Sequence, residues 1–275
     1  MQAQASTLNL RPFALQALAC ADLDRKLALM DELAAATTVH IDPAEALQAD
    51  MLLPGRPARP ELVPPAQLAH RSMASPEGRA ALIHAICHIE FNAINLALDA
   101  IWRFADMPAD YYRDWLRVAL EEAKHFRLLH DLLQQQLGHS YGDFPAHDGL
   151  WTMCEKTAGD ITARMALVPR TLEARGLDAN PQIQRKLRST GTADALAACD
   201  ILDIILREEI GHVAIGNHWY HWLCQRQGLE PLSHYRSLAR QHRAPRLRGP
   251  FNTEARQQAG FTAAELQELA AQDQA

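Results

Sequence analysis

The sequence REEIGH at residues 207–212, inside the mostly apolar segment 195–215, decides the fold of this chain. Its pattern recurs in the sequence LEEAKH at residues 120–125. Both stretches contain Glu-x-x-His, and residues three apart lie on one face of an α-helix. Each stretch can therefore direct one carboxylate and one imidazole at a common point.

The two pairs are Glu209 with His212 and Glu122 with His125. Two matches to so short a pattern are only a mild excess over chance. Their placement is more informative, because both lie in long helical patterns, on the side that faces apolar residues, and each follows a helix with a lone inward Glu. Two such helices, plus one Glu from each of two others, form the four-Glu, two-His site of carboxylate-bridged di-iron bundles. The pattern therefore predicts an all-α protein built on a four-helix bundle.

The lone carboxylates are Glu90 and Glu173. Glu90 lies on an apolar helix face, where an uncompensated Glu is rare. Glu173 lies near a helix end, where it could instead form a surface pair with a neighbouring Arg. Glu155 is its rival in the same predicted helix. Similar separations from Glu90 to Glu122 and from Glu173 to Glu209 suggest two comparable helical hairpins.

The predicted site needs cations, because four ionised carboxylates in a helical core would repel one another and unpaired buried charges are costly. Two divalent metal ions would offset these charges, with neutral His as the remaining ligands. Carboxylates with one imidazole per metal suit iron or manganese better than zinc. We therefore expect two iron ions, with manganese as an alternative, and incomplete coordination that leaves room for dioxygen and a substrate.

The predicted function is a non-haem di-iron oxidoreductase that activates dioxygen to oxidise or hydroxylate an unknown substrate, with the help of an electron donor. The expected metal ligands are Glu90, Glu122, His125, Glu173, Glu209 and His212. Three alternatives stay open. The two Glu-x-x-His pairs could be ordinary helix-surface pairs, the bundle could sequester metal without turnover, or it could be a metal-free interaction scaffold.

Composition excludes several classes of protein. The chain has 275 residues, of which 48% are hydrophobic, so it can bury a large core in one or two domains. A net charge of −6 argues against nucleic-acid binding by the whole surface. We find no apolar run of 18 residues and no signal-peptide pattern, and therefore expect no membrane association. The five cysteines are widely spread without Cys-x-x-Cys, as in reduced, mostly buried thiols of a cytoplasmic protein.

Four parts follow from the pattern along the chain. Residues 1–53 are expected to be an N-terminal helical extension, with a helical pattern over 9–36 that breaks at Ala21-Asp22. Residues 54–75 form a Pro-rich strap that cannot be a regular helix. Residues 76–230 form the bundle, and residues 231–275 form an Arg-rich C-terminal arm with a short helix.

Within the bundle we expect four long helices, over residues 76–105, 108–137, 150–175 and 192–227. Ser75 and Pro76 are a good helix start, and Gly138 a good helix stop. Pro169 should kink the third helix, which we expect to end at Gly176.

Several other polar residues have ordinary explanations. Glu121 and Glu208 adjoin the two motifs and are expected beside the metal ligands. His84 and His88, four apart, could bind metal, but no carboxylate cluster accompanies them, and packed histidines are the simpler reading. The arginines of the arm are more often solvated or ion-paired within the chain than a grip on RNA, although RNA contact through Arg246 and Arg248 stays an alternative.

Long segments of the sequence also resemble a known family. These segments are HAICHIEFNAINLALDAIWRFADMP, DWLRVALEEAKHFRLL, YGDFPAHDGLW, ARMALVPRTLEARGLD, ILREEIGHVAIG and PRLRGPFN. Together they resemble a bacterial family of unassigned function in the ferritin-like superfamily, over nearly the whole chain. The resemblance implies a ferritin-like four-helix bundle with a di-metal centre.

The same resemblance supports the six predicted ligands and extends distantly to a di-iron tRNA hydroxylase of that superfamily. That likeness concerns fold and metal motif only, so it assigns no substrate, and modification of a tRNA base stays an alternative function. One position departs from the family pattern. The resemblance leads us to expect Glu where this chain has Asn95, whereas helical geometry places Asn95 on a polar stripe with His84 and His88, and so favours Glu90.

Overall fold

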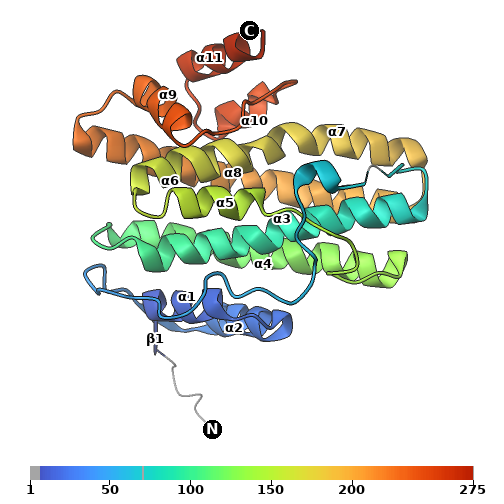
Figure 1. Ribbon diagram of the computed structural model, residues 1–275, viewed down its shortest axis with the longest axis horizontal. Coiled ribbons are helices and arrows are strands. Elements are labelled where there is room, and N and C mark those ends of the chain that lie inside the picture. Colours follow the sequence, from blue (N-terminus) through green and yellow to red (C-terminus); the bar gives the residue numbers. More distant parts are fainter. Residues whose placement is uncertain (1–6, 70, 275) are drawn as a thin grey trace. The chain divides into compact units, whose positions relative to one another are not determined.

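The computed structural model describes residues 7–69 and 71–274, and helices dominate it (Figure 1). This confirms the all-α class. Contacts within the chain divide it into two compact units, residues 1–148 and residues 149–275. The division falls inside the range 76–230 that the sequence assigns to one bundle, and each unit contains one long helical hairpin. The four-helix bundle itself therefore stays a prediction.

The first unit is built on the hairpin of α3 (Pro76–Arg103) and α4 (Ala109–Leu137). As expected, Ser75 caps α3, since its hydroxyl accepts a hydrogen bond from the Gly78 amide at 3.1 Å. Gly138 ends α4 in the left-handed conformation, with a φ of 69°. The two helices pack along their length, and buried apolar side chains of both fill the space between them.

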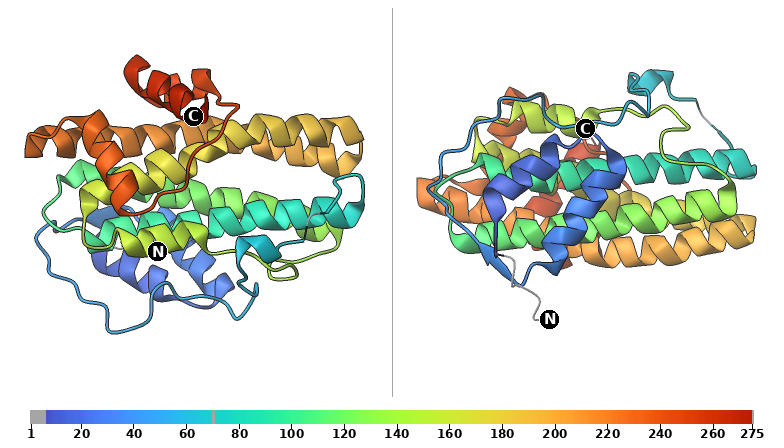
Figure 2. Two further views of the ribbon diagram at one scale, coloured as in Figure 1. Left: turned by 45° about the horizontal axis from the view of Figure 1, so that its top comes forward. Right: turned by 90° about the horizontal axis from the view of Figure 1, so that it is seen from below.

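The N-terminal extension covers this hairpin with two helices, α1 (Leu10–Ala19) and α2 (Leu23–Ala35). The break between them confirms the predicted one, and Asp22 caps α2 by accepting from the Arg25 amide. The first of them packs on α3 and the second on α4 (Figure 2). Two short parallel strands that the sequence did not predict, β1 (Thr7–Asn9) and β2 (Thr38–His40), flank the pair.

In the residues of it that the structure describes, 54–69 and 71–75, the Pro-rich strap is irregular, as expected, apart from the turn η1 (Pro65–Gln67). Leu62 forms an isolated bridge with Ala146 in the loop after α4, where Val63 N–H donates to the Ala146 carbonyl at 2.8 Å. Arg56 forms an ion pair with Asp148 at 2.5 Å. These contacts hold the strap against the loop after α4.

α3 is the central helix of the first unit, and it is buried around most of its circumference. By length and composition it is also apolar enough to cross a membrane, but 78% of that apolar window is buried inside the structure. The core helix of a soluble protein passes the same test. We therefore interpret the apolar character of α3 as core packing.

Lys26 of α2 anchors the N-terminal extension to the polar stripe of α3. Its side chain is fully buried, and its ammonium donates to Asn95 Oδ1 at 2.5 Å and to the carbonyls of Leu18 and Gly55 at 3.3 Å each. It also lies 5.1 Å from the centre of the Phe91 ring. Burial lowers the pKa of Lys26 from its ordinary value of 10.5 to about 7.

We predict that Lys26 makes the stability of the protein depend on pH. Below pH 7 the folded and unfolded chains both hold the proton, whereas between about 7 and 10.5 only the unfolded chain holds it. The free energy of unfolding of the wild type, relative to Lys26→Met, should therefore rise by a few kcal/mol from pH 6 to pH 10. Urea unfolding at both pH values measures this, with the exposed Lys124→Met as the control. A difference that is constant with pH would show that Lys26 titrates normally.

The second unit is built on the hairpin of α7 (Ala174–Thr190) and α8 (Ala193–Gln227), joined at Gly191. The expected range of the last bundle helix is confirmed. The predicted third helix is wrong in detail. Residues 149–173 form α5 (Gly149–Lys156), α6 (Ile161–Leu167) and the π-helical turn η2 (Val168–Glu173). The helix continues through Gly176 and ends at Thr190.

The physical reason for this difference is local. Pro169 lacks an amide hydrogen and widens the helix into a π-turn instead of ending it. Gly176 lies inside α7, and a Cβ at this position would meet nothing within 4 Å. A glycine in a helix interior weakens a helix but does not terminate it unless the backbone turns left-handed. Gly191 does so, with a φ of 67°.

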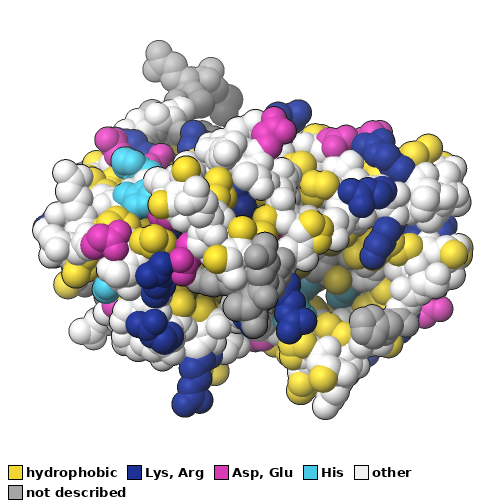
Figure 3. Space-filling model, turned by 90° about the horizontal axis from the view of Figure 1, so that it is seen from above, with side chains coloured by type: hydrophobic (Ala, Val, Ile, Leu, Met, Phe, Trp, Pro, Cys, Tyr) yellow, Lys and Arg dark blue, Asp and Glu magenta, His cyan; other side chains and the backbone are white. Residues whose placement is uncertain are grey.

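The described part of the C-terminal arm holds three helices, α9 (Pro231–Gln241), α10 (Thr253–Gln258) and α11 (Ala263–Gln274), where the sequence predicts one short helix. Two of its arginines confirm the prediction of ion pairing within the chain. Arg256 is fully buried and pairs with Asp178 of α7 at 2.6 Å, and Arg236 pairs with Glu268 of α11 at 2.6 Å. On the face in Figure 3, Lys and Arg side chains lie in small groups among hydrophobic, acidic and other side chains.

We predict that the close packing of η2 on α8 is sensitive to a single methyl group. A Cβ added at Gly216 would lie 2.5 Å from Pro169 Cβ, too close for any contact without a shift of the π-turn. Gly216→Ala should therefore destabilise the protein by about 1–3 kcal/mol in chemical denaturation. Gly176→Ala is the matched control, and it should be neutral or stabilise by up to about 1 kcal/mol. Equal effects of the two substitutions would contradict this account.

Candidate metal centre

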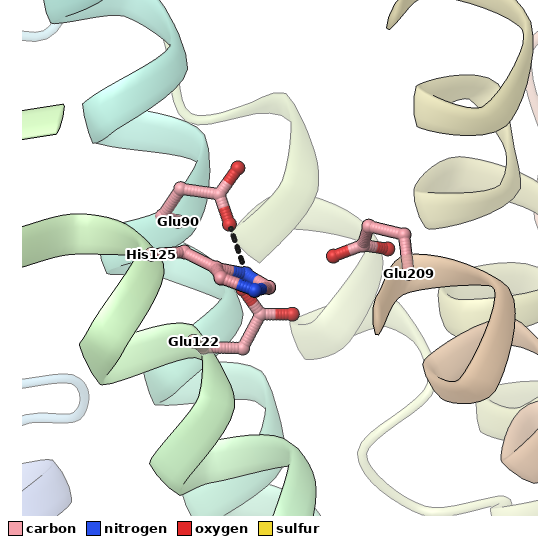
Figure 4. A group of neighbouring side chains, drawn as sticks. All are labelled: Glu90, Glu122, His125 and Glu209. Carbon is pink, nitrogen blue, oxygen red and sulfur yellow. Dashed lines mark hydrogen bonds and ion pairs between the residues drawn. The ribbon is translucent and has the colours of Figure 1, made fainter. Parts of the chain in front are cut away.

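The first unit brings together three of the six predicted ligands, Glu90 of α3 and Glu122 and His125 of α4 (Figure 4). Each offers one ligand atom, and these atoms lie within 4.8 Å of one another. His125 Nδ1 lies 3.3 Å from Glu90 Oε2 and 3.3 Å from Glu122 Oε2. All three side chains are buried, with residue exposures of 4%, 0% and 0%. This arrangement is the lone Glu facing a Glu-x-x-His pair that the sequence predicts.

The charges in this cluster are strongly coupled. Burial, followed by repulsion from Glu122, raises the pKa of Glu90. Burial by itself lowers the pKa of His125, but the hydrogen bonds and negative charges of Glu122 and Glu90 outweigh it and raise the pKa. The cluster therefore holds protons where its three ligand atoms converge. A divalent cation at this position would replace those protons, so the donor set fits a metal ion.

Two buried histidines of α3, His84 and His88, have partners outside this cluster. His84 Nε2 accepts from the Gly142 amide at 2.9 Å, and His88 Nδ1 lies 2.8 Å from the Tyr141 hydroxyl. Burial lowers the pKa of both histidines to about 4. They are therefore packed, neutral side chains, as the sequence analysis predicts.

Asn95, where the family resemblance leads us to expect Glu, lies on the same polar stripe. Its Oδ1 accepts the hydrogen bond from the buried Lys26 of α2, and Asn95 itself is fully buried. The carboxylate of α3 that lies with Glu122 and His125 is Glu90. Asn95 has a structural role between α2 and α3.

The second unit holds the other three predicted ligands. Glu209 and His212 lie on α8, with His212 Nδ1 3.2 Å from Glu209 Oε1, and their exposures are 8% and 0%. This repeats the contact between Nδ1 of His125 and the carboxylate three residues before it. Figure 4 draws Glu209 as well.

Glu173 is the last residue of η2 and is 8% exposed. Pro169 of η2 packs on Gly216 of α8. Glu173 lies four residues after Pro169, and His212 lies four residues before Gly216. Because neighbouring helices of a hairpin run antiparallel, this packing brings Glu173 and His212 to about the same level.

Glu155, the alternative to Glu173 as the fourth carboxylate, lies on α5. Glu155 is an exposed residue of α5, and its Oε1 accepts a hydrogen bond from Trp151 Nε1 at 3.0 Å. Glu121 and Glu208, which adjoin the two motifs, are half-buried. The burial of Glu173 therefore favours it over Glu155 as the carboxylate of this region.

Sequence reasoning missed one polar network beside Glu173. Arg170 of η2 is buried and bonds to Asn217 of α8 and Glu265 of α11. One signal could have pointed to Glu265. The sequence Thr262-x-x-Glu265 is a capping-box pattern, and Glu265 Oε2 accepts from the Thr262 amide at 2.8 Å.

Comparisons with known proteins identify a family but no function. The model of a family described as a protein of unknown function (DUF455) matches residues 19–267. An uncharacterised protein of Haemophilus influenzae is 52% identical over 217 residues, which cover 76% of this chain and 74% of the relative. No solved structure matches the chain.

We predict that Glu90→Gln has little effect on the stability of the metal-free protein. The raised pKa of Glu90 means that this carboxyl holds a proton near neutral pH, so the neutral amide resembles the group it replaces. With a chelator present, the free energy of unfolding at pH 7 should change by less than about 1 kcal/mol. Glu155→Gln is the surface control. A loss of several kcal/mol would show that Glu90 is ionised and paired with His125.

Proposed function

Because the chain belongs to the DUF455 family of proteins of unknown function, we propose a function from its own residues, that of a di-metal carboxylate oxidoreductase acting with dioxygen. The observation that carries this proposal is the cluster of Glu90, Glu122 and His125, in which two buried carboxylates and an imidazole converge. Buried carboxylates are rare without a counter-charge, and a polar cluster of this kind commonly marks a functional site.

The ligands of the two units have matching chemistry. Each unit supplies a lone Glu and a Glu-x-x-His pair on a neighbouring helix, and in both pairs the imidazole Nδ1 faces the carboxylate three residues earlier. Three ligands leave a metal ion with open positions. We propose that both sets contribute to one di-metal centre, with the two hairpins forming a ferritin-like four-helix bundle. The resemblance of long sequence segments to that superfamily supports this proposal.

Iron is the metal that the donor set fits best, with manganese as the alternative, since carboxylates and imidazole suit both and the set contains no thiolate. A bound iron pair would supply electrons for the reduction of dioxygen. The chain's own residues bind and orient the ions. Because all the side chains of the first-unit cluster are buried, they also keep bulk water away from it.

Protein residues can also move protons in this site. The raised pKa values of Glu90 and His125 mean that the metal-free cluster holds protons, and metal binding releases them. Metal affinity should therefore increase with pH through neutrality.

The metal content per chain tests the proposal. After anaerobic reconstitution with ferrous ion, the wild type should hold about two metal ions per chain. Glu122→Ala and Glu209→Ala, which remove one ligand from each unit, should both lose them. Glu155→Ala, which removes an exposed carboxylate, should keep them. If the wild type holds no stoichiometric metal, the hypothesis of a metal site is wrong, and a metal-free helical scaffold becomes the better explanation.

Dioxygen consumption tests the redox part separately. The reconstituted wild type should consume dioxygen when a reductant is added, and Glu122→Ala should do so at no more than the rate of free ferrous ion. An oxygen electrode measures both. Stoichiometric metal without dioxygen consumption would instead support metal binding without turnover.

A further inference from the structure

Arg170 occupies an unusual position in the second unit. It lies in η2, three residues before Glu173, and is only 3% exposed. Its Nη1 donates to Asn217 Oδ1 of α8 at 2.6 Å, and its Nη2 donates to Glu265 Oε1 of α11 at 2.5 Å. Arg170 thus links the π-turn to the long helix beside it and to the C-terminal arm.

Three aromatic rings enclose the same guanidinium group. Its central carbon lies 5.1 Å from the ring centre of Tyr220, 5.4 Å from that of Tyr235 and 4.8 Å from that of Phe261. These distances allow cation–π attraction, which is strongest when the cation is removed from water. Tyr235 also contacts η2 directly, because its hydroxyl lies 3.0 Å from Thr171 Oγ1.

Glu265 is held in place from its other side. Its Oε2 accepts from the amide and the hydroxyl of Thr262 at the start of α11, and His221 of α8 lies 3.1 Å from its Oε1. Burial alone would raise the pKa of Glu265, but His221, Arg170 and Thr262 together lower it to about 2. Glu265 is therefore an ionised partner for Arg170 at all ordinary pH values.

The arm reaches the other end of η2 through a second buried arginine. Arg256 donates to Asp178 of α7 at 2.6 Å and to the carbonyl of Ala174, the residue after Glu173, at 3.2 Å. The Phe261 ring lies 5.1 Å from its guanidinium, so one ring contacts both arginines. The arm therefore contacts the Arg170 and Thr171 side chains before Glu173 and the Ala174 backbone carbonyl after it.

We propose that the C-terminal arm is a positioning element of the metal centre, which holds the π-turn through Arg170 so that Glu173 keeps the place of a ligand. A buried ion pair contributes little to stability when compared with well-packed apolar side chains, so stability alone is a weak reason for this network. π-turns, in contrast, occur frequently at functional sites. Arg170 and Glu265 act through Glu173, and both are positioning residues.

This inference rests on the proposed function, because it assumes that Glu173 binds metal. Two measurements on the full-length chain separate the two ideas. Amide hydrogen exchange of residues 168–173 in the metal-free protein reports on the π-turn alone. Titration with Co²⁺, followed by its visible absorption spectrum, reports on metal binding.

The key variants are Glu265→Gln, which removes the charge but keeps the shape, and Arg170→Met, which leaves the start of α11 intact. Both should speed exchange of residues 168–173 by about tenfold or more and weaken Co²⁺ binding by a similar factor, with an altered spectrum. Glu268→Gln is the matched control, because it breaks a similar ion pair of α11 with the exposed Arg236. It should change both quantities less than twofold.

Unchanged exchange in Glu265→Gln and Arg170→Met, or an equal effect of Glu268→Gln, would overturn the role of the arm. Faster exchange with unchanged Co²⁺ affinity and spectrum would also overturn the proposal, because Glu173 would then not be a ligand. If the wild type binds no Co²⁺, the proposed function fails as well. Faster exchange in the two variants would in that case show only that the arm holds the π-turn.

Discussion

The burial of two carboxylates beside one imidazole is the constraint on which the first unit depends. If both were ionised, Glu90 and Glu122 would repel each other in a medium that screens charge poorly. The raised pKa of Glu90 and the nearby His125 imidazole reduce this repulsion. α3 and α4 must therefore lie close enough for the imidazole to reach both carboxylates. The apolar side chains along the hairpin supply the burial free energy that offsets this local cost.

A second constraint acts on α3, because its opposite face is also polar. Asn95 and the two histidines of that face need hydrogen-bond partners once they are buried. The N-terminal extension supplies Lys26, and the loop after α4 supplies the Gly142 amide and Tyr141. The extension is therefore part of the first unit, since it satisfies polar groups that would otherwise destabilise the central helix.

In the second unit the main constraint is the irregular backbone at Pro169. Pro169 removes one helical hydrogen bond, and the resulting π-turn packs directly on Gly216 of α8. The arm then stabilises this turn through Arg170 and its ionised partner Glu265. Two arginines of the tail, which the sequence predicts to be solvated or ion-paired within the chain, thus form ion pairs with other residues of this unit.

The sequence by itself determined the helical class, the hairpin α3–α4, the extent of α8 and the cluster of Glu90, Glu122 and His125, because helical periodicity and caps are local signals. Only the tertiary structure decided that the helix with Pro169 continues past Gly176, that Asn95 pairs with Lys26, and that Glu155 is exposed whereas Glu173 is buried. Each of these outcomes depends on contacts between residues far apart in the chain. Periodicity shows which face of a helix is apolar, but it does not show which partner a buried polar group meets there.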